Sequence, residues 1–212
     1  MNILVILGHP SKDSFNHAIA ATVVETLQQA GHEVAFHDLY DEGFDPLLPA
    51  EEIPGDADLP TYIQGHCAEI AEADGIVIVH PNWWGQPPAI LKGWIDRVIR
   101  PGVAYEFEEG DIGEGVPVKL LKAESALVFT TSNTPITREI EAFGDPLETL
   151  WKNCVFWTCG IRNFRRRNFG VVINSTHEQR QRWLEEVREI VAMYFVRGGT
   201  LSNNTDSQGN QR

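Results

Sequence analysis

The chain has 212 residues, which suits one domain that buries its core without disulfides or structural metals. Its composition, 42% hydrophobic and 22% charged, is that of an ordinary globular protein. The formal net charge of −13 argues against nucleic acid or an anionic membrane as a partner, because phosphates repel such a surface.

The three cysteines, Cys67, Cys154 and Cys159, are odd in number and lack metal-ligand spacing. Free thiols in a reducing compartment are the simplest interpretation. The N-terminus enters an apolar run directly, without a basic leader, and no apolar stretch is long enough to cross a bilayer. We therefore expect a cytoplasmic protein without an inserted membrane segment.

The first part of the chain alternates between the strand and helix periods. Residues 2–7 (NILVIL) form a continuous apolar run, typical of a strand buried on both faces of a parallel sheet. Helical spacing follows over 15–30 and stops at Gly31, and 33–37 then predict a short strand. The segment 41–60 is rich in Pro and Asp and is expected to be a loop.

The rest of the chain continues this rhythm. The predicted elements are a helix over 61–72, a strand over 75–79 (GIVIV), a helix over 89–99, a loop over 101–118, a strand over 125–130 (SALVFT), a helix over 146–158, a strand over 169–173 and a helix over 178–197. The tail 198–212 has almost no apolar residues and is predicted to be disordered. The chain therefore divides into one domain, 1–197, and a short tail.

Five strands alternating with helices indicate an α/β fold with a doubly wound parallel sheet, helices on both faces and right-handed crossovers. The strand order most compatible with this length is 2-1-3-4-5. Such sheets bind ligands beyond the carboxyl ends of their strands, near the switch point between strands 1 and 3. The loops after Leu7, Val79 and Thr130 are therefore expected to converge on one site.

The first of these loops runs from Gly8 to Asn16 (GHPSKDSFN) and joins a buried strand to a helix. A phosphate placed there would meet free backbone N–H groups and the positive end of the helix dipole. The loop has neither GxGxxG nor GxxxxGK[ST], which counts against a Rossmann fingerprint and a P-loop. We interpret it as a phosphate site; the alternative is that Ser14 only caps the helix.

The second loop, 80–88 (HPNWWGQPP), follows the strongest strand. Two adjacent tryptophans, Trp83 and Trp84, rarely enter one core together, because their side chains point in different directions. At a strand end they suit a flat aromatic ligand, with one of the two assigned to packing as the alternative. The third loop, 130–135 (TTSNTP), offers short hydroxyl and amide side chains to a polar ring edge, although such a run is also found in ordinary turns.

Taken together, these loops resemble the NAD(P)H:quinone reductase family, including the Kef-type ancillary oxidoreductases. The likeness runs from residue 3 to about 173, and its PAILKGW segment is specific. The residues that carry it are His9 with Ser14-Phe15-Asn16, Gly43-Phe44-Asp45-Pro46, His80-Pro81-Asn82-Trp83-Trp84, Pro88 to Trp94, Asp96-Arg97-Val98, Thr130-Thr131 and Cys159-Gly160.

The resemblance implies a flavodoxin-like fold, a tightly bound flavin, two-electron hydride transfer from NAD(P)H to a quinone or similar small acceptor, and a homodimer. By position, His9, Ser14, Phe15 and Asn16 would hold the flavin phosphate. Pro81, Asn82, Trp83 and Trp84 would line the isoalloxazine, and Thr130 and Thr131 would lie at its polar edge. Ser132 and Asn133, which follow in the same loop, are cofactor-binding candidates from their hydroxyl and amide groups. The loop at 45–60 is shorter than in the longer animal members, where extra residues reach the adenine of FAD, and this favours FMN.

The chain departs from the family after Thr131. Family members continue with two glycines and then a Tyr and a His that help to stabilise reduced flavin, whereas residues 136–143 contain neither. Arg138 is the candidate to offset negative charge on reduced flavin, with surface solvation as the alternative. The basic run at Arg162 and 165–167 is interpreted either as solvated or salt-bridged charge or as a contact to the 2′-phosphate of NADPH.

Two other functions remain open from the sequence. A flavodoxin-type electron carrier fits the acidic charge, because such carriers dock on basic partners, but flavodoxins open with a different phosphate loop. A redox-sensing regulatory subunit of a transporter would use the flavin as a bound ligand. The preferred hypothesis is the flavin-dependent oxidoreductase.

Overall fold

Five parallel strands form the central sheet of the computed structural model, which describes residues 1–108, 115 and 117–196. The strands are β1 (Asn2–Leu7), β2 (Glu33–Asp38), β3 (Gly75–Pro81), β6 (Ser125–Ser132) and β7 (Asn163–Gly170). Their order is β2-β1-β3-β6-β7. This is the predicted order 2-1-3-4-5 once the short strands β4 (Tyr105–Glu106) and β5 (Val118–Lys119), which pair only with each other, are set aside.

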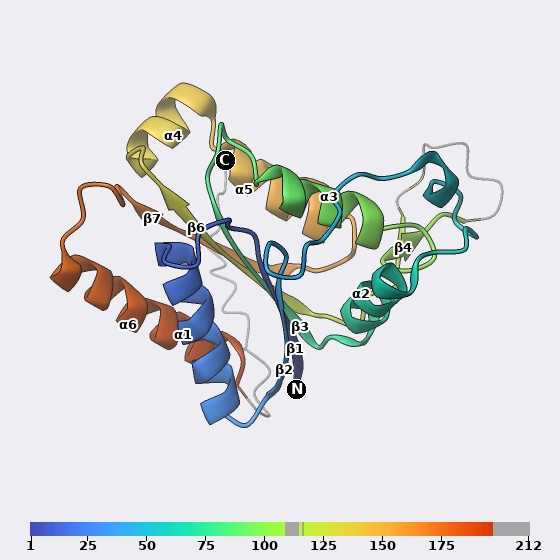
Figure 1. The fold of residues 1–212 in the computed structure, drawn as a ribbon, viewed down its shortest axis with the longest axis horizontal. Coiled ribbons are helices and arrows are strands. Elements are labelled where there is room, and N and C mark those ends of the chain that lie inside the picture. The colour runs from blue at the N-terminus through green and yellow to red at the C-terminus, as the bar shows by residue number, and fades with distance from the viewer. Residues whose placement is uncertain (109–114, 116, 197–212) are drawn as a thin grey trace, which may run out of the picture.

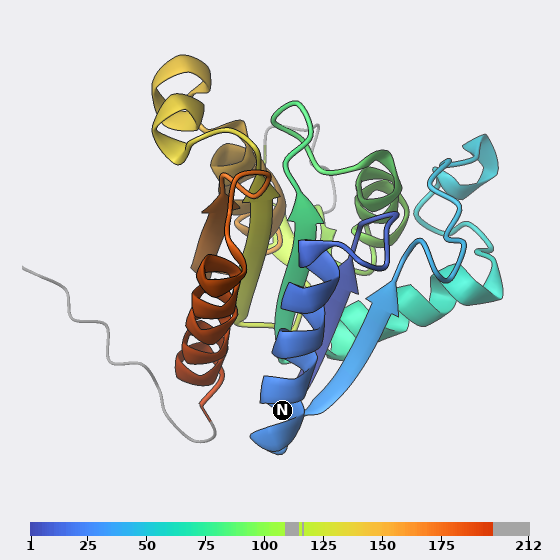
Figure 2. The same cartoon turned by 60° about the vertical axis from the view of Figure 1, so that its left-hand side comes forward.

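Helices cover both faces of the sheet (Figures 1 and 2) because the side chains of each strand alternate between two cores. Ile3, Val5 and Leu7 of β1 pack toward α1 (Phe15–Gln29) and α6 (His177–Tyr194). Leu4 and Ile6 pack toward the opposite core, with α2 (Thr61–Glu72), α3 (Ala89–Val98) and the segment that follows α5 (Pro146–Glu148). A strand buried on both sides needs a continuous apolar run, which is what NILVIL provides.

The last strand begins earlier than predicted. β7 starts at Asn163 and includes Arg165, Arg166 and Arg167, whereas the sequence placed a strand at 169–173 with this basic run in front of it. β7 is an edge strand, so charged side chains are tolerated. Arg166 forms ion pairs with Asp145 and Glu148, and Arg167 forms one with Glu186, which supports the salt-bridge interpretation of the run.

Two other elements differ from the prediction. Helix α4 (Ile136–Phe143) follows the third loop directly, after Pro135. The predicted helix at 146–158 is instead α5 followed by a π-helix, η2 (Thr149–Phe156). The loop at 41–60 contains one 3-10 turn, η1 (Ala50–Glu52), and the predicted disordered tail lies outside the described residues. Among the helices that the structure describes, none combines the length and apolar character needed to cross a bilayer.

Candidate functional site

Three loops that are far apart in the sequence meet at the carboxyl ends of β1, β3 and β6. The side-chain amide of Asn16 donates a hydrogen bond to Thr131 Oγ1 (2.9 Å), which joins the first loop to the third. The backbone N–H of Asn82 donates to the carbonyl of Thr131 (2.7 Å), which joins the second to the third. The rings of His9 and Trp83 lie 6.3 Å apart, so the first and second loops also meet. The convergence expected from the parallel topology is present.

The first loop ends at the N-terminus of α1. Ser14 is the N-cap, with extended backbone, and its Oγ accepts a hydrogen bond from the backbone N–H of His17 (3.2 Å). The preceding N–H groups, of Phe15 and Asn16, belong to the first helical turn and have no acceptor within the helix. His9 is half-buried, and burial lowers the pKa of its imidazole. This end of the helix is therefore suited to bind an anion. Ser14 also caps the helix, as the alternative interpretation of the loop held.

The second loop contains a tight turn that displays a tryptophan. Trp83 and Gln86 exchange two backbone hydrogen bonds of 3.0 Å each, and the residues between them, Trp84 and Gly85, have positive φ angles of 58° and 73°. Gly85 tolerates this conformation, whereas Trp84 is held in it by the turn. The Trp84 side chain is fully exposed and that of Trp83 is 42% exposed, so both indoles are available to a ligand.

The third loop differs from the prediction at Thr130. Its hydroxyl donates to Asn168 Oδ1 (2.9 Å) and its side chain is fully buried beneath the site, so it does not line the cavity. The next four residues, Thr131 to Thr134, do line it. Ser132 Oγ accepts from the N–H of Thr134 (2.9 Å) and Asn133 Oδ1 accepts from the N–H of Ile173 (2.9 Å), which holds the loop in shape.

These loops surround a cavity of about 790 Å³, within the range of sites for cofactors and drug-sized ligands. Residues predicted from the sequence that line it are His9, Ser14, Phe15, Asn16, Pro81, Asn82, Trp83, Trp84, Thr131, Ser132, Asn133 and Arg138. Lining residues that sequence reasoning missed include Ser11, Gly85, Thr134, Glu139, Phe143, Pro146 and Val172.

Helix α4 supplies two of these missed residues, Glu139 and Phe143, beside the predicted Arg138. Glu139 is buried, while Phe143 is 55% exposed and its ring lies 5.9 Å from the Arg138 guanidinium. The recurrence of Ile136, Ile140 and Phe143 at helical spacing was the available signal for this helix. Arg138, on the same helix, lines the cavity and is also exposed to solvent, so its position is compatible with both interpretations given for it.

A buried histidine supports the second loop from below. The Trp151 indole N–H donates to His80 Nε2 (2.9 Å), so the ring proton is on Nδ1, which donates to the carbonyl of Pro81 (2.8 Å). Burial lowers the pKa of His80 to about 4, so the ring is neutral at pH 7. His80 is thus part of the scaffold of the loop, and its partner Trp151 is fully buried in the core.

The arrangement suits a ligand with an anionic group and a flat ring. The anion would lie at the start of α1, and the ring would lie among Trp83, Trp84 and Phe143, with hydroxyl and amide groups at its edge. Backbone donors and aromatic walls bind and orient such a ligand without supplying a nucleophile.

Comparison with known proteins gives concordant matches. A family model described as the flavodoxin-like fold matches residues 1–191. An uncharacterized NAD(P)H oxidoreductase of Haemophilus influenzae is 38% identical over 174 residues, 80% of this chain and 84% of that protein. NAD(P)H dehydrogenase [quinone] 1 of Cavia porcellus is 36% identical over 123 residues, 49% of this chain and only 45% of that protein. The solved NAD(P)H:quinone oxidoreductase of Methanothermobacter marburgensis superposes with a TM-score of 0.76 at 26% identity, covering 90% of this chain and 95% of that one.

Proposed function

Since the chain belongs to the family with the flavodoxin-like fold, in which its relatives are named as NAD(P)H oxidoreductases and quinone reductases, we propose that it is a flavin-dependent NAD(P)H oxidoreductase. It transfers hydride equivalents from NAD(P)H, through the bound flavin, to a quinone or similar small two-electron acceptor. The observation that carries this proposal is the meeting of three strand-end loops around one cavity.

The flavin phosphate is assigned to the start of α1. Ser14 and the first-turn N–H groups of Phe15 and Asn16 provide donors there, and the helix dipole favours negative charge. Lys12 forms an ion pair with Asp41 at the surface, so the backbone rather than a lysine would supply the main attraction. Backbone N–H groups can bind a phosphate without a basic surface around them. Phosphate binding at this helix end is therefore compatible with the net charge of −13.

The ring system is assigned to the cavity between Trp83, Trp84 and Phe143, with Thr131 and Ser132 at its polar edge. A flavin bound there would supply the two-electron chemistry between NAD(P)H and the second substrate. The chain orients the ring, excludes water from one face and places the Arg138 guanidinium at the cavity, where its positive charge favours an anionic bound ring.

FMN is the proposed form of the cofactor. Of the described residues in the loop 45–60, none lines the cavity. This loop is instead tied to α3, where Arg97 donates to both carboxylate oxygens of Glu52 (2.9 and 2.5 Å). It therefore has no place in the cavity to meet an adenine.

Two further assignments accompany the function. The free cysteines Cys67, Cys154 and Cys159 support a reducing, cytoplasmic location. A homodimer is supported by exposed apolar side chains: Ile136, Ile140 and Phe143 on α4, of which Phe143 lines the cavity together with Trp84. The domain assignment 1–197 with a separate tail is retained as part of the same proposal.

Reconstitution tests the proposal directly. The purified protein is incubated with FMN or FAD, passed over a desalting column, and its visible spectrum is recorded. We expect one flavin per chain, followed by NADH or NADPH oxidation that depends on a benzoquinone acceptor and shows ping-pong kinetics. A protein that retains neither flavin would contradict the enzyme, and flavin retention without two-electron turnover would favour the electron carrier.

Trp84→Ala tests the assignment of the ring. Loss of one aromatic wall should lower flavin affinity by roughly tenfold, about 1.4 kcal/mol. Trp157→Ala is the matched control, because Trp157 is also partly exposed (39%) but does not line the cavity. Equal flavin affinity in the two variants would remove Trp84 from the site.

A further inference from the structure

A second cavity lies at the outer edge of the sheet, beside β2 and α2. Its volume is about 590 Å³, and it shares no lining residue with the candidate flavin site. Two imidazoles, His37 and His66, line it together with three carboxylates, Glu42, Asp45 and Glu69. His37 is the fifth residue of β2, Glu42 lies in the loop that follows, and both His66 and Glu69 come from α2.

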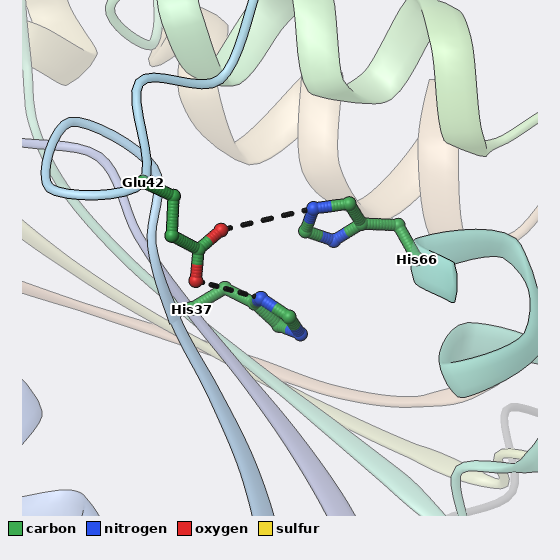
Figure 3. Close-up of side chains that lie close together, drawn as sticks. All are labelled: His37, Glu42 and His66. Atoms are coloured by element: carbon green, nitrogen blue, oxygen red, sulfur yellow. Dashed lines mark hydrogen bonds and ion pairs between the residues drawn. The ribbon is translucent and has the colours of Figure 1, made fainter. Parts of the chain in front are cut away.

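Three of these side chains point toward one another (Figure 3). The two carboxylate oxygens of Glu42 face one ring each, with His37 Nδ1 at 2.9 Å and His66 Nε2 at 3.7 Å. One ligand atom from each residue lies within 4.8 Å of the others. Donors about 2.1 Å from a tetrahedral metal ion are about 3.4 Å apart, so side chains whose ligand atoms already lie within 4.8 Å of one another are close enough to share one ion after a modest movement.

Glu69 orients the His37 ring. Its carboxylate accepts a hydrogen bond of 2.5 Å from His37 Nε2, on the side of the ring away from Glu42. A carboxylate on one imidazole nitrogen places the proton there and leaves the lone pair of the other nitrogen free to bind a metal. Nδ1 faces Glu42 Oε1 at hydrogen-bond distance (2.9 Å), so a metal ion bound to Nδ1 would take the place of that hydrogen bond, with Glu69 still holding the ring.

His66 is held by burial and by Trp94. Its ring is 6% exposed, and the rings of His37 and His66 lie 4.3 Å apart, closer than two positively charged rings would favour. The Trp94 indole N–H donates to His66 Nδ1 over 3.4 Å, which is the long end of the hydrogen-bond range. A metal on Nε2 would move the ring proton to Nδ1 and break this weak bond, which makes the Trp94 N–H a reporter for binding.

We propose that His37, Glu42 and His66 bind a divalent transition-metal ion of the Zn²⁺ class, with Glu69 as the positioning residue of His37. Transition-metal ions bind imidazole nitrogens well, whereas Ca²⁺ and Mg²⁺ prefer oxygen ligands. Two imidazoles and one carboxylate therefore favour an ion of the Zn²⁺ class. Three protein ligands in an open cavity leave a position for water or a small anion. The site is independent of the flavin, because the two cavities have no residue in common.

The test uses tag-free full-length protein in a Cys154→Ser background, since Cys154 is an exposed thiol that would bind zinc by itself. After dialysis against EDTA, ZnCl₂ and CoCl₂ are titrated by calorimetry, with and without FMN. We expect one ion per chain in both cases, a visible Co²⁺ spectrum of a four- or five-coordinate ion, and a shift of the Trp94 indole N–H proton resonance, assigned with Trp94→Phe.

Glu42→Gln, His66→Gln and Glu69→Gln should each weaken binding at least about tenfold. His177→Asn and Glu72→Gln are the matched controls, because both residues are exposed and lie outside the cavity. Glu42 is itself 37% exposed on a loop, so Glu42→Gln tests the proposal even if His66→Gln does not fold. Absence of a one-to-one ion, or equal affinity in Glu42→Gln and the controls, would mean that the cluster is only a set of imidazole–carboxylate ion pairs.

Discussion

Ser14 has two roles at the residue scale, and one substitution separates them. Ser14→Ala removes the cap of α1, which should lower the free energy of unfolding by about 1 kcal/mol. If the same hydroxyl also binds the flavin phosphate, flavin affinity should fall about tenfold in addition. Urea unfolding of the flavin-free protein and flavin titration measure the two effects separately.

Thr176→Ala provides the control for this prediction. Thr176 caps α6 in the same way, with its hydroxyl accepting from the N–H of Gln179 (3.2 Å), but it does not line the cavity. Thr176→Ala should lower the free energy of unfolding by a similar amount without changing the flavin affinity. If Ser14→Ala behaves identically, Ser14 is only a helix cap.

His80 predicts a pH dependence of stability. Burial holds its pKa at about 4 in the folded protein, below the 6.5 of an exposed imidazole, so the unfolded state takes up the proton first as the pH falls. The stabilisation from the neutral ring is complete above pH 6.5 and is lost between pH 6.5 and 4, by an amount on the order of 3 kcal/mol.

His80→Gln isolates this contribution. A glutamine can accept from Trp151 and donate to the Pro81 carbonyl, yet it does not titrate. Urea unfolding from pH 7 to 4.5 should therefore show a shallower loss of stability in His80→Gln than in the parent. Parallel curves would indicate that His80 is not responsible.

At the scale of elements, Gly93 shows how the 41–60 loop and helix α3 depend on each other. A Cβ at Gly93 in α3 would lie 2.2 Å from the carbonyl oxygen of Pro46 and 2.4 Å from its Cα, so the 41–60 loop presses directly on the helix. These backbone atoms of Pro46 cannot move aside without shifting the loop. Gly93→Ala should destabilise the protein by about 1–3 kcal/mol, as overpacking of a core does, measured by the urea midpoint.

Gly65→Ala gives the opposite expectation within another helix. A Cβ at Gly65 in α2 would meet nothing within 4 Å, so the substitution should stabilise the protein by about 0.5–1 kcal/mol through helix propensity alone. Equal effects of the two substitutions would show that the 41–60 loop does not hold its position against α3.

At the scale of the molecule, the exposed apolar side chains predict self-association. Ile140 and Phe143 are each 55% exposed on α4, and Trp84 is fully exposed nearby at the cavity rim. Sedimentation velocity at micromolar concentration should give twice the chain mass of 23.8 kDa. Ile140→Glu should shift this toward the monomer, because a charge would be buried in the interface.

Met193→Glu is the control for the assembly. Met193 is 58% exposed on α6, on the opposite face of the sheet from α2 and α3, and its replacement should leave the sedimentation coefficient unchanged. A monomer in the parent protein, or dissociation by both substitutions alike, would contradict an interface at α4.

The order of the strands and the place of the site could be predicted from the sequence. Continuous apolar runs such as NILVIL and GIVIV specify strands buried on both faces, and a parallel sheet brings the loops after Leu7, Val79 and Thr130 to one edge. These features follow from local periodicity and chain connectivity, and both can be determined from the order of the residues alone.

Other features were decided only by tertiary structure. The basic run in β7 predicts a loop from the sequence, because only the fold brings Asp145 and Glu148 to Arg166, and Glu186 to Arg167, at the edge of the sheet. The burial of Thr130, the α4 wall of the cavity and the meeting of His37 with His66 likewise depend on which elements pack together. The physical reason is that ion pairing, burial and coordination distance are set by neighbours in space, whereas periodicity is set by neighbours along the chain.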